Sequence, residues 1–277
     1  MLCSFQFKQF SVKQDAAAMK VGTDGVLLGA WVSLRGDERQ ILDVGTGTGL
    51  IALMLAQRTA PVTTPVTTAL AATESAILGI EIDPAAAAEA AANFAASPWA
   101  DRLVTRPVSL QSFLDSQVHP DHHESDLIGS VCVDRVFGHE GLSRGPEPEP
   151  GAAGAFDLIV SNPPFFKASL KAPEARRRTA RHDDTLPPAE LIAAARQLLS
   201  PAGRLAVIYP PEEARAFVLE AEAAGLYLTR LTRVVSVAGQ PPKRHLLEFS
   251  RTAGMPRFDD LVIGSAEYRN LTGDFYL

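Results

Sequence analysis

The segment of residues 41–57, ILDVGTGTGLIALMLAQ, places the strongest constraint on what this chain can fold into. An apolar run at its start leads into a turn that contains Gly45, Gly47 and Gly49, and an apolar helical pattern follows. Glycine adopts positive φ values without a steric penalty, so a strand can turn sharply there into a helix. This order of elements is typical of the first βα unit of a doubly wound sheet, whose ligands bind at the carboxyl ends of the strands.

The rest of the chain repeats this alternation of apolar runs and helical patterns, which is typical of a parallel sheet covered on both faces. Strands are predicted at residues 41–44, 77–80, 103–108, 156–160 and 205–209, and helices at 49–57, 84–96, 188–199 and 211–224. Two further runs, 227–237 and 244–250, predict a hairpin that would leave an antiparallel strand at the edge of the sheet. We therefore expect an α/β fold: a single Rossmann-like domain over residues 1–277, with a mostly parallel seven-stranded sheet and helices on both faces.

Two segments interrupt the alternation and are expected to be surface insertions. Residues 58–75 alternate Thr, Pro and Ala, and residues 115–154 collect histidines and then Gly, Pro and Glu. The first composition leaves no room for a packed face. The second fits a solvated loop, in which residues 129–137 could pair as a short strand. No Cys/His spacing typical of zinc accompanies His119, His122 and His123, so no metal site is predicted.

The composition indicates a globular protein of the cytoplasm. Of the 277 residues, 46% are hydrophobic, which is enough for a sizeable core and excludes a chain disordered throughout. The two cysteines cannot form a disulfide scaffold, no apolar run approaches the roughly 18 residues of a membrane span, and the first residues lack the layout of a secretion signal. The net charge of −6 argues against nucleic acid coating the whole surface but permits a local basic patch.

The glycine turn predicts a nucleoside cofactor with a cationic tail. Its spacing is GxGxG, which differs from the GxGxxG of dinucleotide enzymes, and an acid, Asp43, precedes it. An acid there suits a ligand with a cationic amine, while Glu81 at the end of the next strand can accept both hydroxyls of a ribose. S-adenosylmethionine combines these groups. We assign its site to the turn and its flanking residues, namely Asp43, Gly45, Thr46, Gly47, Gly49, Glu81 and Ile82. The plainer alternative is a tight βα turn without a ligand.

A second motif, Asn162-Pro163-Pro164-Phe165, directly follows the fourth strand. Prolines cannot continue a central strand, so the chain must leave the sheet beside the glycine turn. The Asn162 side-chain oxygen and the Pro163 carbonyl could accept hydrogen bonds from a planar NH2 group and direct its lone pair at a methyl group. Phe165 would supply a flat surface for a planar substrate. These four residues are the predicted catalytic residues, and Asn162 is also assigned to the cofactor site. A rigid turn without chemistry is the alternative.

These two motifs, in this order, resemble the class I S-adenosylmethionine-dependent methyltransferases of the group that methylates amino groups through an NPPF/Y motif. Residues 5–12 and the stretch KVGTDGVLLGAW, residues 20–31, are similar to the opening of the bacterial tRNA(Val) (adenine-37-N6)-methyltransferases. The likeness continues at residues 243–250 and 268–277, and it covers nearly the whole chain apart from the two insertions.

The resemblance implies an enzyme that flips an adenine of the tRNA anticodon loop into the Asn-Pro-Pro-Phe turn. It implies that residues 1–40 cover the cofactor, with Lys20, Thr23, Asp24 and Gly25 across its open side. In this family an acid usually follows the third strand and meets the adenine amine of the cofactor. Ser109 stands at that position here, and the resemblance implies that its hydroxyl takes the place of the acid.

A basic cluster near the second motif is predicted to contact RNA phosphates. Its members are Lys167, Arg176, Arg177, Arg178 and Arg181, with Lys243 and Arg244 from the hairpin. Phosphate contacts give affinity without sequence choice. A merely solvated charged face is the alternative.

Other functions remain open at this level. The second motif also suits methylation of a glutamine amide in peptide release factors, although only about 40 residues precede Asp43, too few for the helical domain that those enzymes carry. A guanine-N2 methyltransferase of ribosomal RNA and a non-catalytic cofactor-binding module are further alternatives. We expect a monomer or a homodimer.

Overall fold

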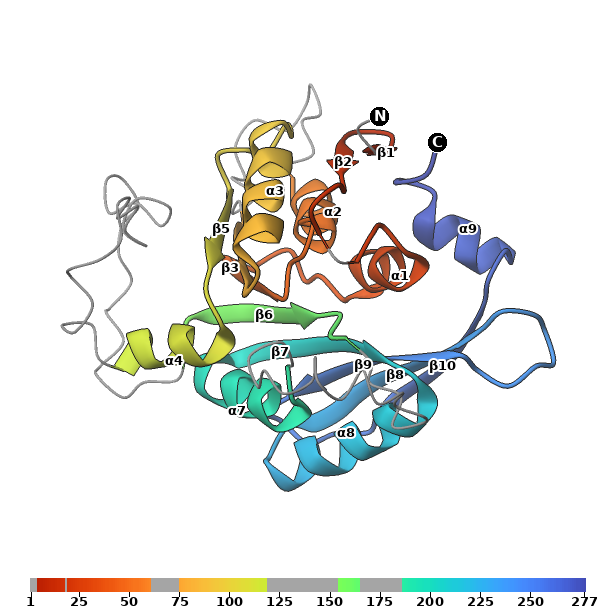
Figure 1. Cartoon of the computed structure of the whole chain (residues 1–277). Helices are drawn as coiled ribbons and strands as arrows, with labels where there is room; N and C mark the ends of the chain where they lie inside the picture. The colour runs from red at the N-terminus through yellow and green to blue at the C-terminus, as the bar shows by residue number, and fades with distance from the viewer. Residues whose placement is uncertain (1–3, 18, 61–74, 119–153, 165–185) are drawn as a thin grey trace, which may run out of the picture.

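A computed structural model describes residues 4–17, 19–60, 75–118, 154–164 and 186–277 (Figure 1). At its centre lies a sheet of eight strands in the order β10-β8-β9-β7-β6-β3-β4-β5. The strands are β3 (Gln40–Val44), β4 (Ala76–Glu81), β5 (Leu103–Pro107), β6 (Phe156–Ser161), β7 (Leu199–Tyr209), β8 (Tyr227–Val235), β9 (Arg244–Ser250) and β10 (Arg257–Val262). Five neighbouring strands run parallel, in the order β7, β6, β3, β4 and β5. Their carboxyl ends therefore share one edge of the sheet.

The prediction of an antiparallel strand at the edge of the sheet is wrong. β8 and β9 form the expected hairpin, but β9 lies between β7 and β8 and pairs antiparallel with both. β10 then adds parallel to β8 and forms the outer edge, as the eighth strand. The side chains of β9 explain its inner position, because Leu246 on one face and Leu247 and Phe249 on the other are completely buried.

The helices cover both faces of the sheet, as predicted (Figure 1). On one face lie α1 (Thr23–Trp31), α2 (Leu50–Arg58) and α3 (Pro84–Ala95), and on the other lie α4 (Leu110–Val118), α7 (Pro188–Leu198) and α8 (Pro211–Ala223). Each face has its own apolar core: Leu27, Leu53 and Phe94 belong to the first, and Phe113 and Phe217 to the second. The α/β class with a mostly parallel sheet is therefore confirmed.

The two ends of the described chain meet beside α1. A short hairpin of β1 (Ser4–Gln6) and β2 (Ser11–Lys13) lies near the segment that follows α9 (Ala266–Thr272), as Figure 1 shows. The Phe7 ring is completely buried, with its centroid 4.7 Å from that of Phe10 and 6.1 Å from that of Tyr276. The Lys8 N–H donates to the Phe275 carbonyl at 2.9 Å. Residues far apart in the sequence thus fix the N-terminal hairpin on the body.

Most of each predicted insertion lies outside the described residues. At the margins of the first, the Arg58 guanidinium donates to the Gly29 carbonyl at 2.9 Å, and Ser75 is buried with its hydroxyl donating to the Glu38 carbonyl at 2.6 Å. α4 includes the first residues of the second segment, 115–118. The organisation of the whole chain as a single domain stays a prediction.

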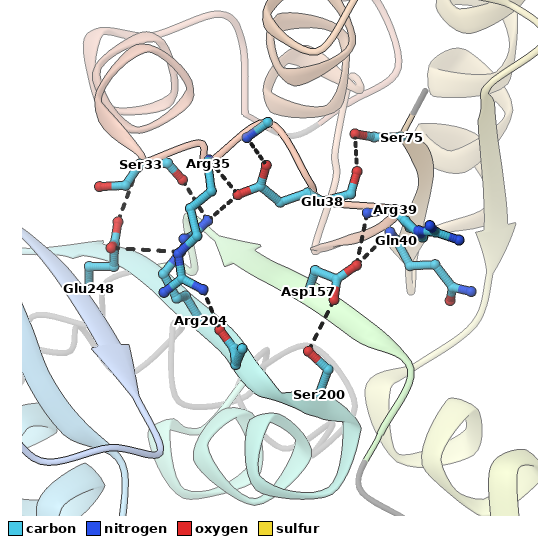
Figure 2. A network of polar contacts seen from close by, with 12 residues as sticks. Ser33, Arg35, Glu38, Arg39, Gln40, Ser75, Asp157, Ser200, Arg204 and Glu248 are labelled. Carbon is cyan, nitrogen blue, oxygen red and sulfur yellow. Dashed lines mark hydrogen bonds and ion pairs between the residues drawn. The ribbon is translucent and has the colours of Figure 1, made fainter. Parts of the chain in front are cut away.

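A buried ionic network holds the amino ends of the parallel strands together (Figure 2). The Arg204 guanidinium donates to Glu38 and to the Ser33 carbonyl, and its Nε lies 3.8 Å from Glu248 Oε1. Burial alone would raise the pKa of Glu38, but hydrogen bonds from the Arg35 backbone and from Arg204 bring that pKa below its ordinary value. This network stabilises the edge opposite the predicted site, which leaves the carboxyl edge for ligands.

Candidate active site

The two sequence motifs meet at the carboxyl ends of adjacent strands. In the parallel pair β3–β6, Val44 is aligned with Ser161, and the buried Ser161 hydroxyl donates to the Val44 carbonyl at 2.8 Å. The next residue of each strand, Gly45 and Asn162, therefore leaves the sheet beside the other. The structure thus brings the predicted cofactor turn and the predicted catalytic turn together.

The glycine turn has the backbone that its sequence predicts. Gly45, Gly47 and Gly49 have φ values of 70°, 54° and 82°, in the left-handed region that favours glycine. A Cβ at Gly45 or Gly47 would meet no described atom within 4 Å, whereas one at Gly49 would collide with the Phe94 ring. The first two glycines therefore leave room for a ligand at the backbone, and the third allows α2 to pack against α3.

Asp43 is a completely buried acid, and one of its two carboxylate oxygens accepts hydrogen bonds from described residues. Its Oδ2 accepts hydrogen bonds from the Thr46 hydroxyl at 2.7 Å and from the Ala52 N–H at 3.2 Å. No donor among the described residues reaches the buried Oδ1. Burial raises the pKa of Asp43 to about 7, against the two hydrogen bonds and with a further contribution from the charge of Glu81. An orphaned carboxylate oxygen of this kind suits a cationic group of a ligand.

Glu81 joins the second strand end to the glycine turn. Its Oε2 accepts the Gly47 N–H at 2.9 Å, and its Oε1 accepts the Asp83 N–H at 3.1 Å. A carboxylate oxygen can accept more than one hydrogen bond, so both oxygens can also receive the hydroxyls of a ribose. The neighbouring Ile82 side chain is 43% exposed, which leaves an apolar surface beside the proposed nucleoside.

Asn162 is half-buried, and its side-chain oxygen is the second acceptor of this site without a described hydrogen-bond donor. The Oδ1 atom is buried, and within the described part of the chain it has no donor. The next residue, Pro163, is buried and Pro164 is exposed. Phe165 lies outside the described residues. Asn162 therefore presents an unused acceptor beside the glycine turn, as the proposed recognition of an NH2 group requires.

The N-terminal helix lies against the same turn. A Cβ at Gly25 would lie 3.9 Å from Asn162 Nδ2 and 3.1 Å from Leu50, so glycine permits the close approach of α1. Thr23 and Lys20 are exposed near the start of this helix. The structure therefore brings Gly25 close to Asn162, while the covering of the cofactor by Lys20, Thr23, Asp24 and Gly25 stays a prediction.

Asp24 and Arg244 form an ion pair at 2.7 Å, from Asp24 Oδ2 to Arg244 Nε. They line a hollow of about 300 Å³ together with Thr23, Leu27, Val234 and Lys243. Asp24, predicted to cover the cofactor, thus contacts a residue predicted to bind RNA. The other residues of the predicted RNA cluster, Lys167, Arg176, Arg177, Arg178 and Arg181, lie outside the described residues.

Ser109 forms hydrogen bonds within the first turn of α4. Its hydroxyl accepts the Ser112 N–H at 3.1 Å and donates to the Ser112 hydroxyl at 3.0 Å, in the manner of a helix N-cap. Its predicted contact with the cofactor stays a prediction. A residue that the sequence reasoning missed is Asn93 on α3, whose side chain donates to the Thr48 carbonyl of the glycine turn at 2.9 Å. The available signal was a polar residue four positions after Glu89 in the otherwise alanine-rich run at 85–96.

No group of three or more His, Cys, Asp or Glu side chains that could hold a metal ion occurs among the described residues. None of the helices that the structure describes has the length and apolarity needed to cross a bilayer.

Solved structures confirm the fold, and sequence relatives identify the family. A crystal structure from Agrobacterium tumefaciens, described as a predicted O-methyltransferase, superposes with a TM-score of 0.54 at 16% identity and covers 91% of this chain and 96% of its own. No protein-family model matches the chain.

Two relatives illustrate the similarity in sequence. A protein of Porphyromonas gingivalis is 42% identical over 98% of this chain and 94% of its own length, and one of Trichodesmium erythraeum is 39% identical over 99% and 97%. Both are named tRNA1(Val) (adenine(37)-N6)-methyltransferase. At this identity over nearly the full length, the chain belongs to the tRNA1(Val) (adenine(37)-N6)-methyltransferase family and is an S-adenosylmethionine-dependent methyltransferase.

Proposed function

We propose that this chain transfers a methyl group from S-adenosylmethionine to the exocyclic N6 of adenine 37 in tRNA1(Val). The names of its relatives give the substrate. The observation in the structure that carries the proposal is the pair of orphaned acceptors, Asp43 Oδ1 and Asn162 Oδ1, on strands whose ends lie side by side. One suits a cationic group and the other suits an NH2 group, so the two reactants would meet at neighbouring strand ends.

The cofactor would be held by the glycine turn and by the two acids that flank it. When bound, S-adenosylmethionine supplies a methyl group on a positively charged sulfur. Asp43 Oδ1 would receive the cationic amine of its amino-acid tail, and the Glu81 carboxylate would accept the ribose hydroxyls. The open space over Gly45 and Gly47 lets the ligand approach the backbone. Ionisation of Asp43 is then favoured, because a cation replaces the missing donor.

Asn162 would orient the amine of the target base. The lone pair of an adenine amine is delocalised into the ring, which makes the nitrogen a poor nucleophile. Acceptors at Asn162 Oδ1 and the Pro163 carbonyl would hold its two N–H groups out of the ring plane, so that the lone pair points at the methyl carbon. The alkylated nitrogen loses its extra proton readily, so positioning supplies most of the acceleration.

The RNA would reach the site across the hairpin residues Lys243 and Arg244 and the basic cluster after Pro164. Both hairpin residues lie at the hollow beside α1, and α1 in turn contacts Asn162. Cations at this position can neutralise phosphates on either side of a flipped nucleotide. A tRNA substrate also favours the cytoplasm as the place of action.

The decisive test is methylation of defined RNAs with isotopically labelled S-adenosylmethionine. We expect N6-methyladenosine at position 37 of unmodified tRNA1(Val), and none in a transcript with guanine at that position. N2-methylguanosine in ribosomal RNA or a methylated glutamine in a release factor would instead support one of the rival functions. Binding of the cofactor without transfer to any of these substrates would support a non-catalytic module.

A further inference from the structure

Two polar side chains of α3 face the N-terminal segment, which we define as residues 4–22 apart from residue 18. They are Glu89 and Asn93, which are four residues apart and therefore lie on the same face of the helix. The other residues of α3 between Pro84 and Phe94 are alanines. These two side chains are thus the points at which this helix makes polar contacts with the N-terminal segment.

Asn93 connects that segment to the glycine turn. Its Oδ1 accepts the Lys13 N–H at 2.9 Å, and its Nδ2 donates to the carbonyls of Lys13 and Thr48, both at 2.9 Å. The side chain is only 2% exposed, so water competes little for these bonds. Both amide hydrogens are used, which fixes the amide in one orientation. A single buried side chain therefore holds β2 and the backbone between Gly47 and Gly49 together.

Glu89 holds the next residues of the segment. Its carboxylate accepts three successive backbone N–H groups, those of Asp15, Ala16 and Ala17, at 2.6, 3.0 and 2.9 Å. Hydrogen bonds to a charged acceptor are stronger than those between neutral groups. The segment is therefore attached to α3 at two adjacent places, of which only the Asn93 contact also reaches the glycine turn.

The N-terminal segment lies near the glycine turn at Lys13 and leads through α1 to Asn162. Asn93 bonds both Lys13 and Thr48, and in α1 a Cβ at Gly25 would lie 3.9 Å from Asn162 Nδ2. The intervening residues must therefore pass from the glycine turn to the catalytic turn. In between, the Gln14 side chain accepts the Val21 N–H at 2.7 Å and closes the loop on itself.

We propose that Asn93 is a positioning residue that couples docking of the N-terminal segment to the geometry of the glycine turn, so that the docked segment and bound S-adenosylmethionine stabilise each other. This inference rests on the proposed cofactor site. Coupling between two binding events is reciprocal: what docking adds to the affinity for the cofactor, the cofactor adds to docking.

The test uses three variants of the full chain. Asn93→Leu removes all three hydrogen bonds while keeping a side chain of similar size, and Glu89→Ala releases the segment without touching the Thr48 contact. Ala92→Leu is the matched control, because it places the same leucine at a neighbouring exposed position of α3. Glu89 is partly exposed, so Glu89→Ala leaves no cavity in the apolar core.

We expect Asn93→Leu to raise the Kd for S-adenosylmethionine in calorimetry by about tenfold, the effect of one to two hydrogen bonds. Glu89→Ala should raise it by a smaller factor, and Ala92→Leu should leave it unchanged. At saturating cofactor, kcat of Asn93→Leu should return to within about twofold of the wild-type value, because the reacting groups are untouched. A defect of folding alone would lower the amount of active enzyme and would not separate KM from kcat.

Hydrogen exchange of residues 13–17 gives the reciprocal measurement. In the wild type, saturating cofactor should slow exchange of these amides, and Asn93→Leu should lose that protection. An unchanged Kd in Asn93→Leu, or exchange that does not respond to the cofactor, would overturn the inference. If the wild type bound no S-adenosylmethionine at all, the proposed function would fail. Faster exchange in Asn93→Leu without cofactor would still show that Asn93 holds the N-terminal segment in place.

Discussion

The Ser161 hydroxyl donates a hydrogen bond to the Val44 carbonyl at 2.8 Å, and these two residues are also aligned across the β3–β6 pair. This bond lies at the last aligned position of the two strands, directly before Gly45 and Asn162. It fixes the two turns relative to each other in addition to the strand pairing. The relative position of the two proposed reactants therefore depends on the sheet itself.

Binding of S-adenosylmethionine should depend on pH through Asp43. Burial raises the pKa of this acid to about 7, so below that value a proton must leave before the carboxylate can receive a cation. We expect affinity to rise by about tenfold between about pH 5.5 and 7, where the α-amino group of the ligand remains charged. Calorimetry in buffers of different ionisation enthalpy should detect the released proton.

The Asp43→Asn variant is the control for this pH dependence. It should bind the cofactor weakly, with an affinity that hardly changes over the same pH range. A wild-type affinity that is flat with pH, or a variant that keeps the slope, would assign the titration to another group.

Replacement of Asn162 should separate binding from chemistry. In Asn162→Ala the acceptor for the target amine is lost while Asp43 and Glu81 remain. We expect kcat to fall by about a hundredfold to a thousandfold, as for other preorganised polar groups, with the Kd for S-adenosylmethionine within about twofold. Single-turnover methylation of tRNA1(Val) and calorimetry measure the two quantities. A fully active variant would remove the proposed role.

Gly49 should be the most sensitive glycine of the turn for stability. An alanine there would adopt a left-handed φ of 82° and also press its Cβ into the Phe94 ring. We expect Gly49→Ala to lower the free energy of unfolding by about 2–4 kcal/mol. Gly36→Ala is the matched control, because φ is 87° there but the Cβ would meet no described atom within 4 Å. Equal losses in urea denaturation would contradict the packing argument.

The ionic network of Arg204 should be a strong determinant of stability. Arg204→Met would leave the buried carboxylates of Glu38 and Glu248 without their cation, and we expect a loss of about 3–5 kcal/mol. Arg233→Met is the control, since its ion pair with Asp260 is exposed and should contribute little. Both variants can be compared by urea denaturation, and losses of the same size would contradict this account.

The same network predicts how stability depends on pH. Because the pKa of Glu38 is lowered in the folded state, its contribution is present above the ordinary value of 4.5 and is lost as the pH falls further. Arg204→Met should weaken this dependence.

Lys243 should contribute to RNA affinity without affecting the cofactor. Charge reversal in Lys243→Glu should weaken tRNA binding and reduce the slope of log K against log salt by about one or more, because a phosphate contact is lost. The Kd for S-adenosylmethionine should stay at the wild-type value. Fluorescence anisotropy at several salt concentrations measures the slope, and an unchanged slope would move the RNA surface elsewhere.

Much of the fold follows from local patterns. The apolar runs predicted the five strands from β3 to β7, although β7 begins six residues earlier than expected. The hairpin of β8 and β9 was also correct. The predicted place of this hairpin in the sheet was wrong, because a hairpin can join a sheet through either of its strands. Side chains on both faces of β9 are buried, so β9 is the strand that joins β7.

Several elements gave too little local signal. β1 and β2 have only three residues each and α9 has seven, and no predicted element covered β10. The aromatic contacts of Phe7 with Phe10 and Tyr276 join the two ends of the chain. A periodicity within a few residues cannot reveal contacts at such a separation.

The sequence by itself determined the chemistry of the two turns: glycines that allow positive φ after Asp43, and prolines that end a strand after Asn162. These properties depend on neighbouring residues alone. Only the tertiary structure decided how acidic Asp43 is and which residues hold the N-terminal segment. Burial raises the pKa of Asp43, and burial depends on the packed fold. Packing also brings α3, β2 and the glycine turn together, so that Asn93 reaches Lys13, 80 residues away in the sequence.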